Sequence, residues 1–303
     1  MIDLCLLGTG GTMPLPGRAL TSLLFRYSGR CFLVDCGEGT QVQIRKSNIS
    51  LHDIDVIMIT HFHADHINGL PGLLLSMAKC DRTEPVTIIA PMGAEHIIEC
   101  LCVTAPSMPF SIKIIEIIED YKQYKFGDLI IDAQLANHSV TCYAYSFTLT
   151  RSGKFNPEAA SALGVDIRLW KTLQKGESVT SNGRVITSDM VMGAPRKGIK
   201  LTYCTDTRPT EMLAKLAAHS DLLICEGMYA DEEKYDMAVE KRHMMFFEAV
   251  KLAQKAYVHE LWLTHFSPSL AKPQEYKNYL ANMFQNSLIP SDMEFKTLRF
   301  TDQ

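Results

Sequence analysis

Short apolar runs typical of β-strands dominate the chain, and amphipathic stretches separate several of them. Eight such runs occupy the first half, at residues 4–10, 22–27, 30–37, 56–61, 86–91, 112–118, 128–135 and 142–149. Three more follow at 199–207, 221–227 and 260–267. Helical periodicity is found at 69–79, 94–101, 209–220 and 243–256. Because some strands follow one another directly and others are separated by helices, the order predicts an α/β protein with mixed sheets.

Length and composition are those of a globular protein with one large domain or two small ones. The chain has 303 residues, of which 47% are hydrophobic and 21% are charged, and its net charge is −4. That charge argues against nucleic-acid binding over the whole surface but leaves local patches open. No apolar run reaches the roughly 18 residues of a membrane span. The N-terminus lacks the pattern of a secretory signal, so we expect a cytoplasmic protein without membrane partners.

The cysteines give the same picture. There are nine of them, at scattered spacings and without a CxxC pair. This usage indicates a reducing compartment rather than a disulfide framework or a thiolate zinc site.

Residues 151–200 differ from the rest of the chain. They contain few strand-like runs, many glycine and turn residues, nine basic residues and only four acidic ones. Their net charge is therefore +5, whereas the remainder of the chain carries −9. One interpretation is a solvated surface insertion without a partner. The other is an arm that binds a polyanion.

The stretch "VIMITHFHADHINGLPGLL" places four potential metal ligands directly after an apolar run. His61, His63, Asp65 and His66 fall within six residues. Imidazole nitrogen and carboxylate oxygen are ligands that zinc prefers, and manganese can use the same set. His61 and His63 point the same way in an extended segment, while Asp65 and His66 begin the next turn. This spacing predicts one loop that serves two metals, an arrangement suited to phosphodiester hydrolysis.

Three further residues repeat the pattern of an apolar run followed by a ligand. They are His138 in "LANHSV", Asp206 in "LTYCTDTRP" and His265 in "ELWLTHFS". The histidines at positions 52, 96, 219 and 259 lie in loops or helical stretches, and we interpret them as structural.

Together these features resemble the metallo-β-lactamase fold, and within that superfamily the chain resembles short-form ribonuclease Z (tRNase Z). The matching segments are "LLGTGGTMP", "FLVDCGEGTQ", "ITHFHADHINGLPGLL", "NHSVTCYAYSF", "LWKTLQKGESVTSNGRVI", "APRKG", "CTDTRP" and "LTHFS". They run over nearly the whole chain. The resemblance implies an αβ/βα sandwich of two mixed β-sheets flanked by helices. It implies one domain, residues 1–303, with 151–200 as an inserted, flexible arm.

The resemblance also implies a ligand set for two zinc ions per subunit. His61, His63 and His138 would hold one ion, Asp65, His66 and His265 the other, and Asp206 would bridge them. Asp35 in "VDCGEGTQ" resembles a carboxylate that orients a ligand histidine. The alternative for Asp35 is a buried carboxylate in a turn.

The catalytic residues follow from the same resemblance. A metal-activated hydroxide would attack the phosphodiester, with Asp65 orienting or deprotonating the water. Glu226 and His243 match the pair that protonates the leaving oxygen. The family usually has His-Glu-Ala and His-Ser-Thr at these places, whereas this chain has Cys-Glu-Gly and His-Met-Met. The alternative is therefore a strand-end carboxylate and a helix-start histidine that move no proton.

Two other departures concern the substrate. The arm has "GVDIRLW" where Pro-Pro-Gly-Pro is typical, and Cys-Thr precedes the strand-end aspartate where Ser-Gly is usual.

By resemblance, the activity is removal of the 3′ trailer from precursor tRNA, leaving a 3′-hydroxyl. The short forms are homodimers in which the arm of one subunit positions tRNA at the site of the other. Lys171, Lys175, Arg196 and Lys197 of the arm are candidate tRNA contacts. Arg208 is a candidate phosphate contact near the metals or, alternatively, part of a surface ion pair.

Two rival functions remain open. One is a phosphodiesterase or exoribonuclease that acts on small or cyclic phosphodiesters, or on other RNA, with the same metal site. The other is an RNA-binding paralogue that has lost its chemistry.

Overall fold

Two seven-stranded sheets form the centre of the protein. The computed structural model describes residues 1–105 and 108–301. The first sheet has the order β16-β1-β2-β3-β4-β5-β6, antiparallel from β16 to β3 and parallel from β3 to β6. Its strands are β1 (Ile2–Gly8), β2 (Ser22–Tyr27), β3 (Arg30–Val34), β4 (Ile54–Met58), β5 (Val86–Pro91), β6 (Ile112–Ile117) and β16 (Glu294–Leu298).

The second sheet repeats this plan, with the order β15-β14-β13-β12-β9-β8-β7. It is antiparallel from β7 to β12 and parallel from β12 to β15. Its strands are β7 (Tyr121–Phe126), β8 (Leu129–Leu135), β9 (Tyr143–Arg151), β12 (Arg196–Cys204), β13 (Leu222–Glu226), β14 (Leu261–Thr264) and β15 (Ser287–Leu288).

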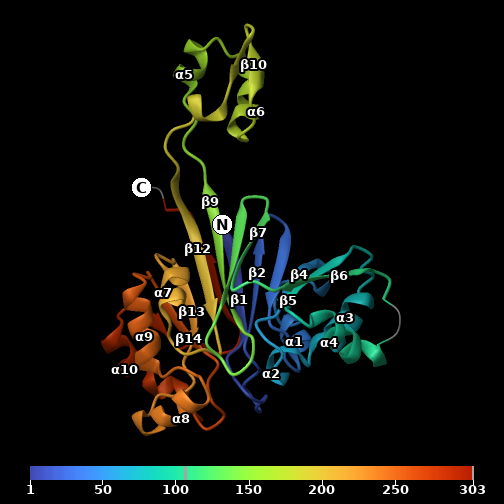
Figure 1. Ribbon diagram of the computed structural model, residues 1–303, viewed down its shortest axis with the longest axis vertical. Helices are drawn as coiled ribbons and strands as arrows, with labels where there is room; N and C mark the ends of the chain where they lie inside the picture. Colours follow the sequence, from blue (N-terminus) through green and yellow to red (C-terminus); the bar gives the residue numbers. More distant parts are fainter. Residues whose placement is uncertain (106–107, 302–303) are drawn as a thin grey trace.

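Helices cover the outer face of each sheet (Figure 1). On the first sheet these are α1 (Thr40–Ile44), α2 (Ala64–Ile67), α3 (Leu70–Ala78) and α4 (Ala94–Leu101). On the second they are α7 (Glu211–Ala217), α8 (Tyr235–Glu240), α9 (Phe246–Lys255) and α10 (Lys277–Met283). Short 3₁₀ turns lie at η1 (Leu51–Asp53), η2 (Cys102–Thr104), η5 (Glu232–Lys234) and η6 (Pro273–Tyr276). The predicted αβ/βα sandwich is confirmed.

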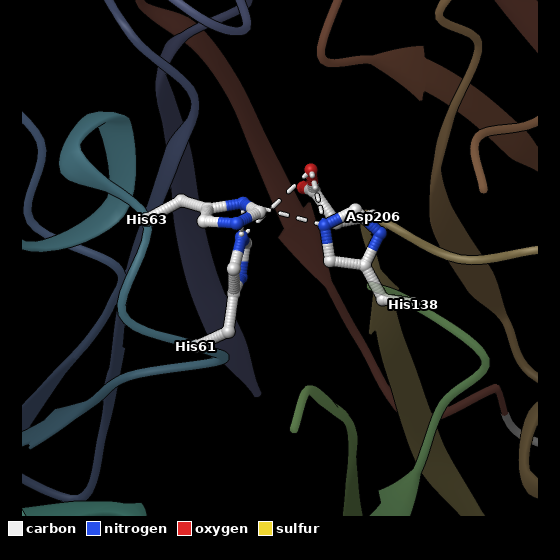
Figure 2. Close-up of side chains that lie close together, drawn as sticks. All are labelled: His61, His63, His138 and Asp206. Carbon is white, nitrogen blue, oxygen red and sulfur yellow. Dashed lines mark hydrogen bonds and ion pairs between the residues drawn. The ribbon is translucent and has the colours of Figure 1, made fainter. Parts of the chain in front are cut away.

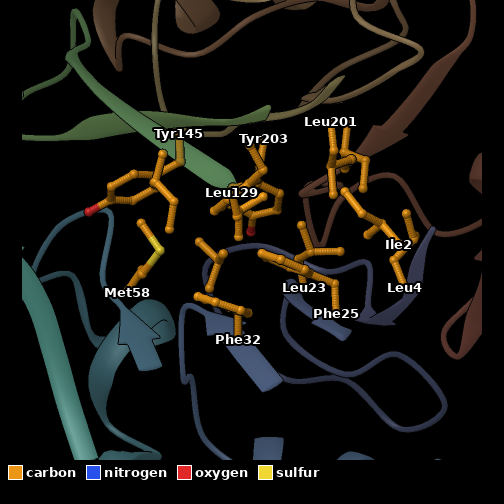
Figure 3. Packing of buried hydrophobic residues seen from close by; sticks show 14 of the residues in the cluster. Ile2, Leu4, Leu23, Phe25, Phe32, Met58, Leu129, Tyr145, Leu201 and Tyr203 are labelled. Carbon is orange, nitrogen blue, oxygen red and sulfur yellow. The ribbon is translucent and has the colours of Figure 1, made fainter. Parts of the chain in front are cut away.

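The inner strands appear as continuous apolar runs because both of their faces are buried, whereas the edge strands β7 and β16 alternate between exposed and partly buried residues. In β1, Leu4 and Leu6 face the other sheet, while Cys5 and Leu7 face the helices. The layer between the sheets is rich in aromatic side chains (Figure 3). There the ring centroid of Phe25 lies 4.6 Å from that of Phe147 in the opposite sheet. This contact is one of many within the buried cluster that joins the two sheets.

The basic segment forms a small unit outside the sheets. Strands β9 and β12 pair as far as Arg151 and Arg196, and the intervening residues fold apart from the sandwich (Figure 1). They form α5 (Pro157–Ala162), η3 (Ile167–Leu169), α6 (Trp170–Gln174), β10 (Val179–Ser181), β11 (Arg184–Ile186) and η4 (Ser188–Met190). This unit has its own buried cluster, which includes Leu173 and Ile186. Residues 196–200, predicted as part of the arm, instead begin β12.

None of the helices in the described part of the chain is both long and apolar enough to cross a membrane.

We expect Phe147→Ala to lower the free energy of unfolding by about 3–5 kcal/mol, because it leaves a cavity between the sheets. Urea unfolding at a fixed metal concentration measures this change. Ile118→Ala is the matched control, since Ile118 is 70% exposed, and it should change the free energy by less than about 0.5 kcal/mol. Equal effects of the two substitutions would contradict the role assigned to the inter-sheet contact.

Candidate metal centre

The loop after β4 brings its histidines to the edge of the sandwich. The chain leaves β4 at Met58, passes the buried His61 and enters α2 with His63 as its N-cap residue. His61 Nε2 and His63 Nδ1 lie 2.9 Å apart. Asp65 and His66 lie within the single turn of α2, and their side chains contribute to a second group of donor atoms beside that of His61 and His63.

The first group of donor atoms comprises His61, His63, His138 and Asp206 (Figure 2). Their donor atoms lie within 4.8 Å of one another. His138 Nε2 is 3.3 Å from His63 Nδ1. Asp206 Oδ1 lies 3.9 Å from both His61 Nε2 and His138 Nε2.

The second group comprises Asp65, His66 and His265, again within 4.8 Å. Asp206 reaches this group with its other oxygen: Oδ2 lies 3.2 Å from both His66 Nε2 and His265 Nε2. Asp65 Oδ2 lies 3.4 Å from His265 Nε2. The structure thus brings together all seven residues that the sequence nominates as ligands, with Asp206 between the two groups.

The donors fit divalent cations. Asp206 is only 2% exposed, and its Oδ2 has no hydrogen-bond partner among the described residues. A buried carboxylate oxygen in this state is unfavourable unless a cation faces it. The donor set contains nitrogen and oxygen only, which suits zinc or manganese. The nearby Cys142 Sγ contacts His61 at Nδ1, on the side of the ring away from the donor nitrogen.

Electrostatics also favour positive charge between the carboxylates. Burial lowers the pKa of His61 and of His138, so both imidazoles are neutral and offer lone pairs. Burial would also lower the pKa of His66 and His265, but the Asp206 carboxylate and its neighbours outweigh it. They raise the pKa of His265 to about 10. Bound cations would replace these protons, because ligand histidines must be neutral.

Three residues of the site have left-handed backbone conformations. The φ angles are 61° for Asp35, 53° for Asp206 and 58° for His265. Each follows the end of a strand, β3, β12 or β14. Such conformations cost roughly 1–3 kcal/mol each outside glycine and persist where the surroundings impose them. Here they turn the side chains inward from the strand ends, a feature for which the sequence carried no signal.

Gly11 explains part of the "GTGG" motif. A Cβ at this position would lie 2.6 Å from Cε1 of His265, so only glycine allows the backbone to pass this ring.

Asp35 lies within hydrogen-bond distance of His66, in a position that would let it orient this ring as the family resemblance implies. Its Oδ2 accepts a hydrogen bond from His66 Nδ1 at 2.9 Å, which leaves Nε2 directed at the donor group. The Thr60 backbone N–H and hydroxyl donate to Asp35 Oδ1 at 2.8 and 2.9 Å. Tyr203 donates to Oδ2 at 3.3 Å. Sequence reasoning missed Thr60 and Tyr203, which lie in buried strands or at their ends and have no motif of their own.

Glu226 and His243 also meet at the site. His243 Nδ1 is 2.9 Å from Glu226 Oε2, and Glu226 Oε1 accepts the N–H of Thr207 at 2.5 Å. Burial opposes protonation of His243, but the Glu226 carboxylate outweighs it and raises the His243 pKa. His243 Nδ1 lies 3.7 Å from Asp206 Oδ1, so by distance His243 could also join a ligand group. Because Glu226 occupies Nδ1, Nε2 is the nitrogen left for other chemistry.

His243 does not begin a helix. The predicted helix at 243–256 begins only at Phe246, with Met245 as the N-cap residue, so His243 lies in the preceding loop.

A cavity of about 620 Å³ opens onto these groups. Its lining includes Asp65, His243 and His265 from the two donor groups and the loop beside them, together with Lys234 and Lys241. The site is therefore accessible to a substrate that carries phosphate.

The basic candidates lie in three different places. Lys171 and Lys175 are exposed on and next to α6 in the arm. Arg196 and Lys197 lie at the base of the arm, where Arg196 Nε donates to Ser152 O and Lys197 Nζ to Asp221 Oδ1. Arg208 forms an ion pair with Glu248 and is not among the lining residues found in the described ranges.

Comparison with solved structures defines the class of fold. Human tRNase Z, short form, has a TM-score of 0.71 at 22% identity, with coverage of 98% of this chain and 100% of that chain. The metallo-β-lactamase fold protein YhfI from Bacillus subtilis has a TM-score of 0.69 at 18% identity, covering 97% and 98%. The protein therefore has the metallo-β-lactamase fold, with seven histidine and aspartate residues gathered where that fold's strands end.

Sequence comparison then defines the family. The chain is 50% identical to Ribonuclease Z of Lachnoclostridium phytofermentans over 99% of both chains. It is 49% identical to Ribonuclease Z of Agathobacter rectalis over the full length of both. The chain belongs to the ribonuclease Z family. A family model described as Anti-Pycsar protein Apyc1 also matches residues 2–156, a range that contains five of the seven candidate ligands.

We expect Asp35→Asn to weaken metal binding by roughly 10- to 100-fold, because the amide orients His66 less well than the carboxylate does. Asparagine tolerates the left-handed backbone at this position. Competition between the protein and a chromophoric chelator for added Zn²⁺ measures the affinity. Asp53→Asn, at a half-exposed carboxylate outside the site, is the control. Unchanged affinity in Asp35→Asn would show that Asp35 only fills a turn.

Proposed function

We propose that this protein is a metal-dependent endoribonuclease that removes the 3′ trailer from precursor tRNA and leaves a 3′-hydroxyl. The observation that carries the proposal is the 50% identity to a ribonuclease Z over 99% of both chains, arm included. The cavity beside the donor groups supports it, because a phosphodiester can enter there.

We further propose two Zn²⁺ ions per subunit, with Mn²⁺ able to use the same ligands. His61, His63 and His138 would hold one, and Asp65, His66 and His265 would hold the other, with Asp206 shared between them. When bound there, the metals would supply Lewis acidity to activate water and to offset negative charge on the phosphoryl oxygens.

The chain's own residues move the protons. Asp65 is held by the backbone N–H of Thr12, which donates to its Oδ2 at 2.6 Å, so its carboxylate can orient the attacking water. His243 donates a proton from Nε2 to the leaving 3′ oxygen. Glu226 accepts a hydrogen bond from Nδ1–H of His243 and so fixes the orientation of the ring. An alkoxide leaving group is strongly basic, so this protonation is needed for cleavage.

Recognition of tRNA belongs to the arm in this proposal. Lys171 and Lys175 are exposed there and would contact phosphates. Such contacts recognise the shape of the RNA rather than its sequence. A homodimer would place the arm of one subunit over the site of the other. The cysteines that the structure describes are all free, as in a reducing compartment, and we place the enzyme in the cytoplasm.

Cleavage of a 3′-extended precursor tRNA tests the function. We expect a single endonucleolytic cut, a 3′-hydroxyl on the tRNA, and loss of activity with chelator. Mapping both product ends on sequencing gels provides the measurement. A 3′-phosphate product, or stepwise shortening from the 3′ end, would contradict the proposed reaction.

Replacing residues 152–195 by a four-residue Gly/Ser turn should remove tRNA cleavage and leave bis(p-nitrophenyl) phosphate hydrolysis within about twofold. The paired ends of β9 and β12 suit such a hairpin. The milder variant Lys171→Glu/Lys175→Glu should raise KM for tRNA. Lys79→Glu/Lys125→Glu, at exposed sites on the sandwich, is the charge-matched control. Normal tRNA cleavage without the arm would show that the substrate is recognised elsewhere.

A further inference from the structure

We propose that Arg208 is a positioning residue that acts through Glu248 to hold the loop bearing His243. The inference rests on the proposed function, since it assigns a role to the proton donor of that reaction. In this proposal Arg208 serves in an internal ion pair and does not contact a phosphate of the substrate.

Arg208 and Glu248 form a two-pronged ion pair. Arg208 Nη1 donates to Glu248 Oε2 at 2.7 Å, and Nη2 donates to Oε1. The side chains are only 15% and 9% exposed, so solvent screens this pair less than a surface pair. Arg208 Nη1 also donates to the backbone oxygen of His243 at 2.5 Å. The Arg208 guanidinium therefore holds His243, the proposed proton donor, through the main-chain oxygen of His243.

Glu248 holds the same loop from the other side. Its Oε2 accepts the backbone N–H of Met245 at 3.0 Å, which caps the first turn of α9. Met245 has no side-chain oxygen to serve as a cap, so this turn depends on Glu248. The loop between α8 and α9 is thus fixed at its end by Glu248 and at His243 by Arg208.

The main chain of Arg208 ties this loop to the metal ligands. Its N–H donates to Asn137 O at 3.0 Å, in the residue before the ligand His138. The preceding residue, Thr207, donates its N–H to Glu226. One short segment after β12 therefore connects the shared aspartate, the His138 loop and the carboxylate that holds the His243 ring.

The contacts of Arg208 oppose a role as a phosphate ligand. Both terminal nitrogens face Glu248, whose charge neutralises the guanidinium. The guanidinium also lies 5.8 Å from the Tyr235 ring centroid. A phosphate would have to displace a paired, largely buried carboxylate. The two roles predict opposite effects of removing the Glu248 carboxylate. If Arg208 is a phosphate ligand, the removal would free it to bind phosphate. If Arg208 is a positioning residue, the removal would release the His243 loop.

Leaving-group dependence tests the proposal. Precursor tRNA loses a sugar alkoxide that needs a proton, whereas bis(p-nitrophenyl) phosphate loses a nitrophenolate that does not. For Arg208→Met and for Glu248→Gln we expect kcat on precursor tRNA to fall by roughly 10- to 100-fold, with KM within about twofold. Both variants should melt at a lower temperature, since each leaves a largely buried group without its partner. Hydrolysis of the nitrophenyl ester and metal content, measured below the melting transition, should stay near wild type. His243→Ala should show the same selectivity with a larger loss.

Combining Arg208→Met with Glu248→Gln should cost no more than either change alone, because both act on one contact. Glu211→Gln is the matched control: it breaks the exposed ion pair between Glu211 of α7 and Lys255 of α9, the helix that carries Glu248. It should leave both reactions unchanged.

Three outcomes would overturn the proposal. A raised KM in Arg208→Met with normal or improved activity in Glu248→Gln would make Arg208 a phosphate ligand. Equal losses on both substrates, or loss of metal, would make the pair merely structural. Unchanged tRNA cleavage in both variants would show that His243 needs no such support. If the wild-type protein leaves precursor tRNA intact, the proposed function fails, and a short single-stranded RNA, which also loses an alkoxide, decides the positioning role.

Discussion

The buried carboxylate of Asp206 is the constraint on which the rest of the site depends. An ionised carboxylate at 2% exposure loses its hydration, at a cost of several kcal/mol. That cost is offset only if positive charge or proton donors surround both oxygens. The histidine rings of both donor groups meet this need, and cations between them would meet it more fully. Neighbouring features can therefore be understood as ways of keeping that arrangement in place.

The sandwich provides the necessary rigidity. The ligands come from the ends of β4, β12 and β14 and from the loop after β8, which belong to two different sheets. Their spacing is set by the aromatic layer between the sheets, since close-packed interiors do not deform gradually. The left-handed backbone at Asp206 and His265 then directs these side chains toward the donor groups. Gly11, which has no Cβ, leaves room for the His265 ring. Local strain is tolerated here because the packed sheets impose it.

The candidate ligands could be predicted from the sequence, whereas the residues that hold them in place could not. Strand-end ligands could be found because an apolar run followed by His or Asp is a local pattern. The mixed sheets could also be predicted, although their arrangement as a sandwich came from the family resemblance. The pairing of Arg208 with Glu248 was invisible, because the two residues are 40 positions apart and meet only in the fold. The start of α9 was placed too early, since helical periodicity cannot show where a cap stands.

The distribution of charge links the metal centre to the substrate. Outside residues 152–195 the chain carries −5, so the sandwich as a whole does not attract RNA. Arg208, the basic residue nearest to Asp206 in sequence, is neutralised by Glu248 and contributes little to attraction. In the proposed function, positive charge for the scissile phosphate would come from the bound cations and from Lys234 and Lys241 at the cavity. Residues 152–195, which fold apart from the sandwich, carry a net charge of only +1. The other four basic residues of the segment lie on β9 and β12 at the base of the arm: Arg151, Arg196, Lys197 and Lys200. In the proposed function, attraction over longer distance would come from the arm and its base together. The proposed function thus assigns binding and cleavage to different parts of the protein, with the arm of one subunit holding a substrate whose scissile phosphate lies at the metal site of the other.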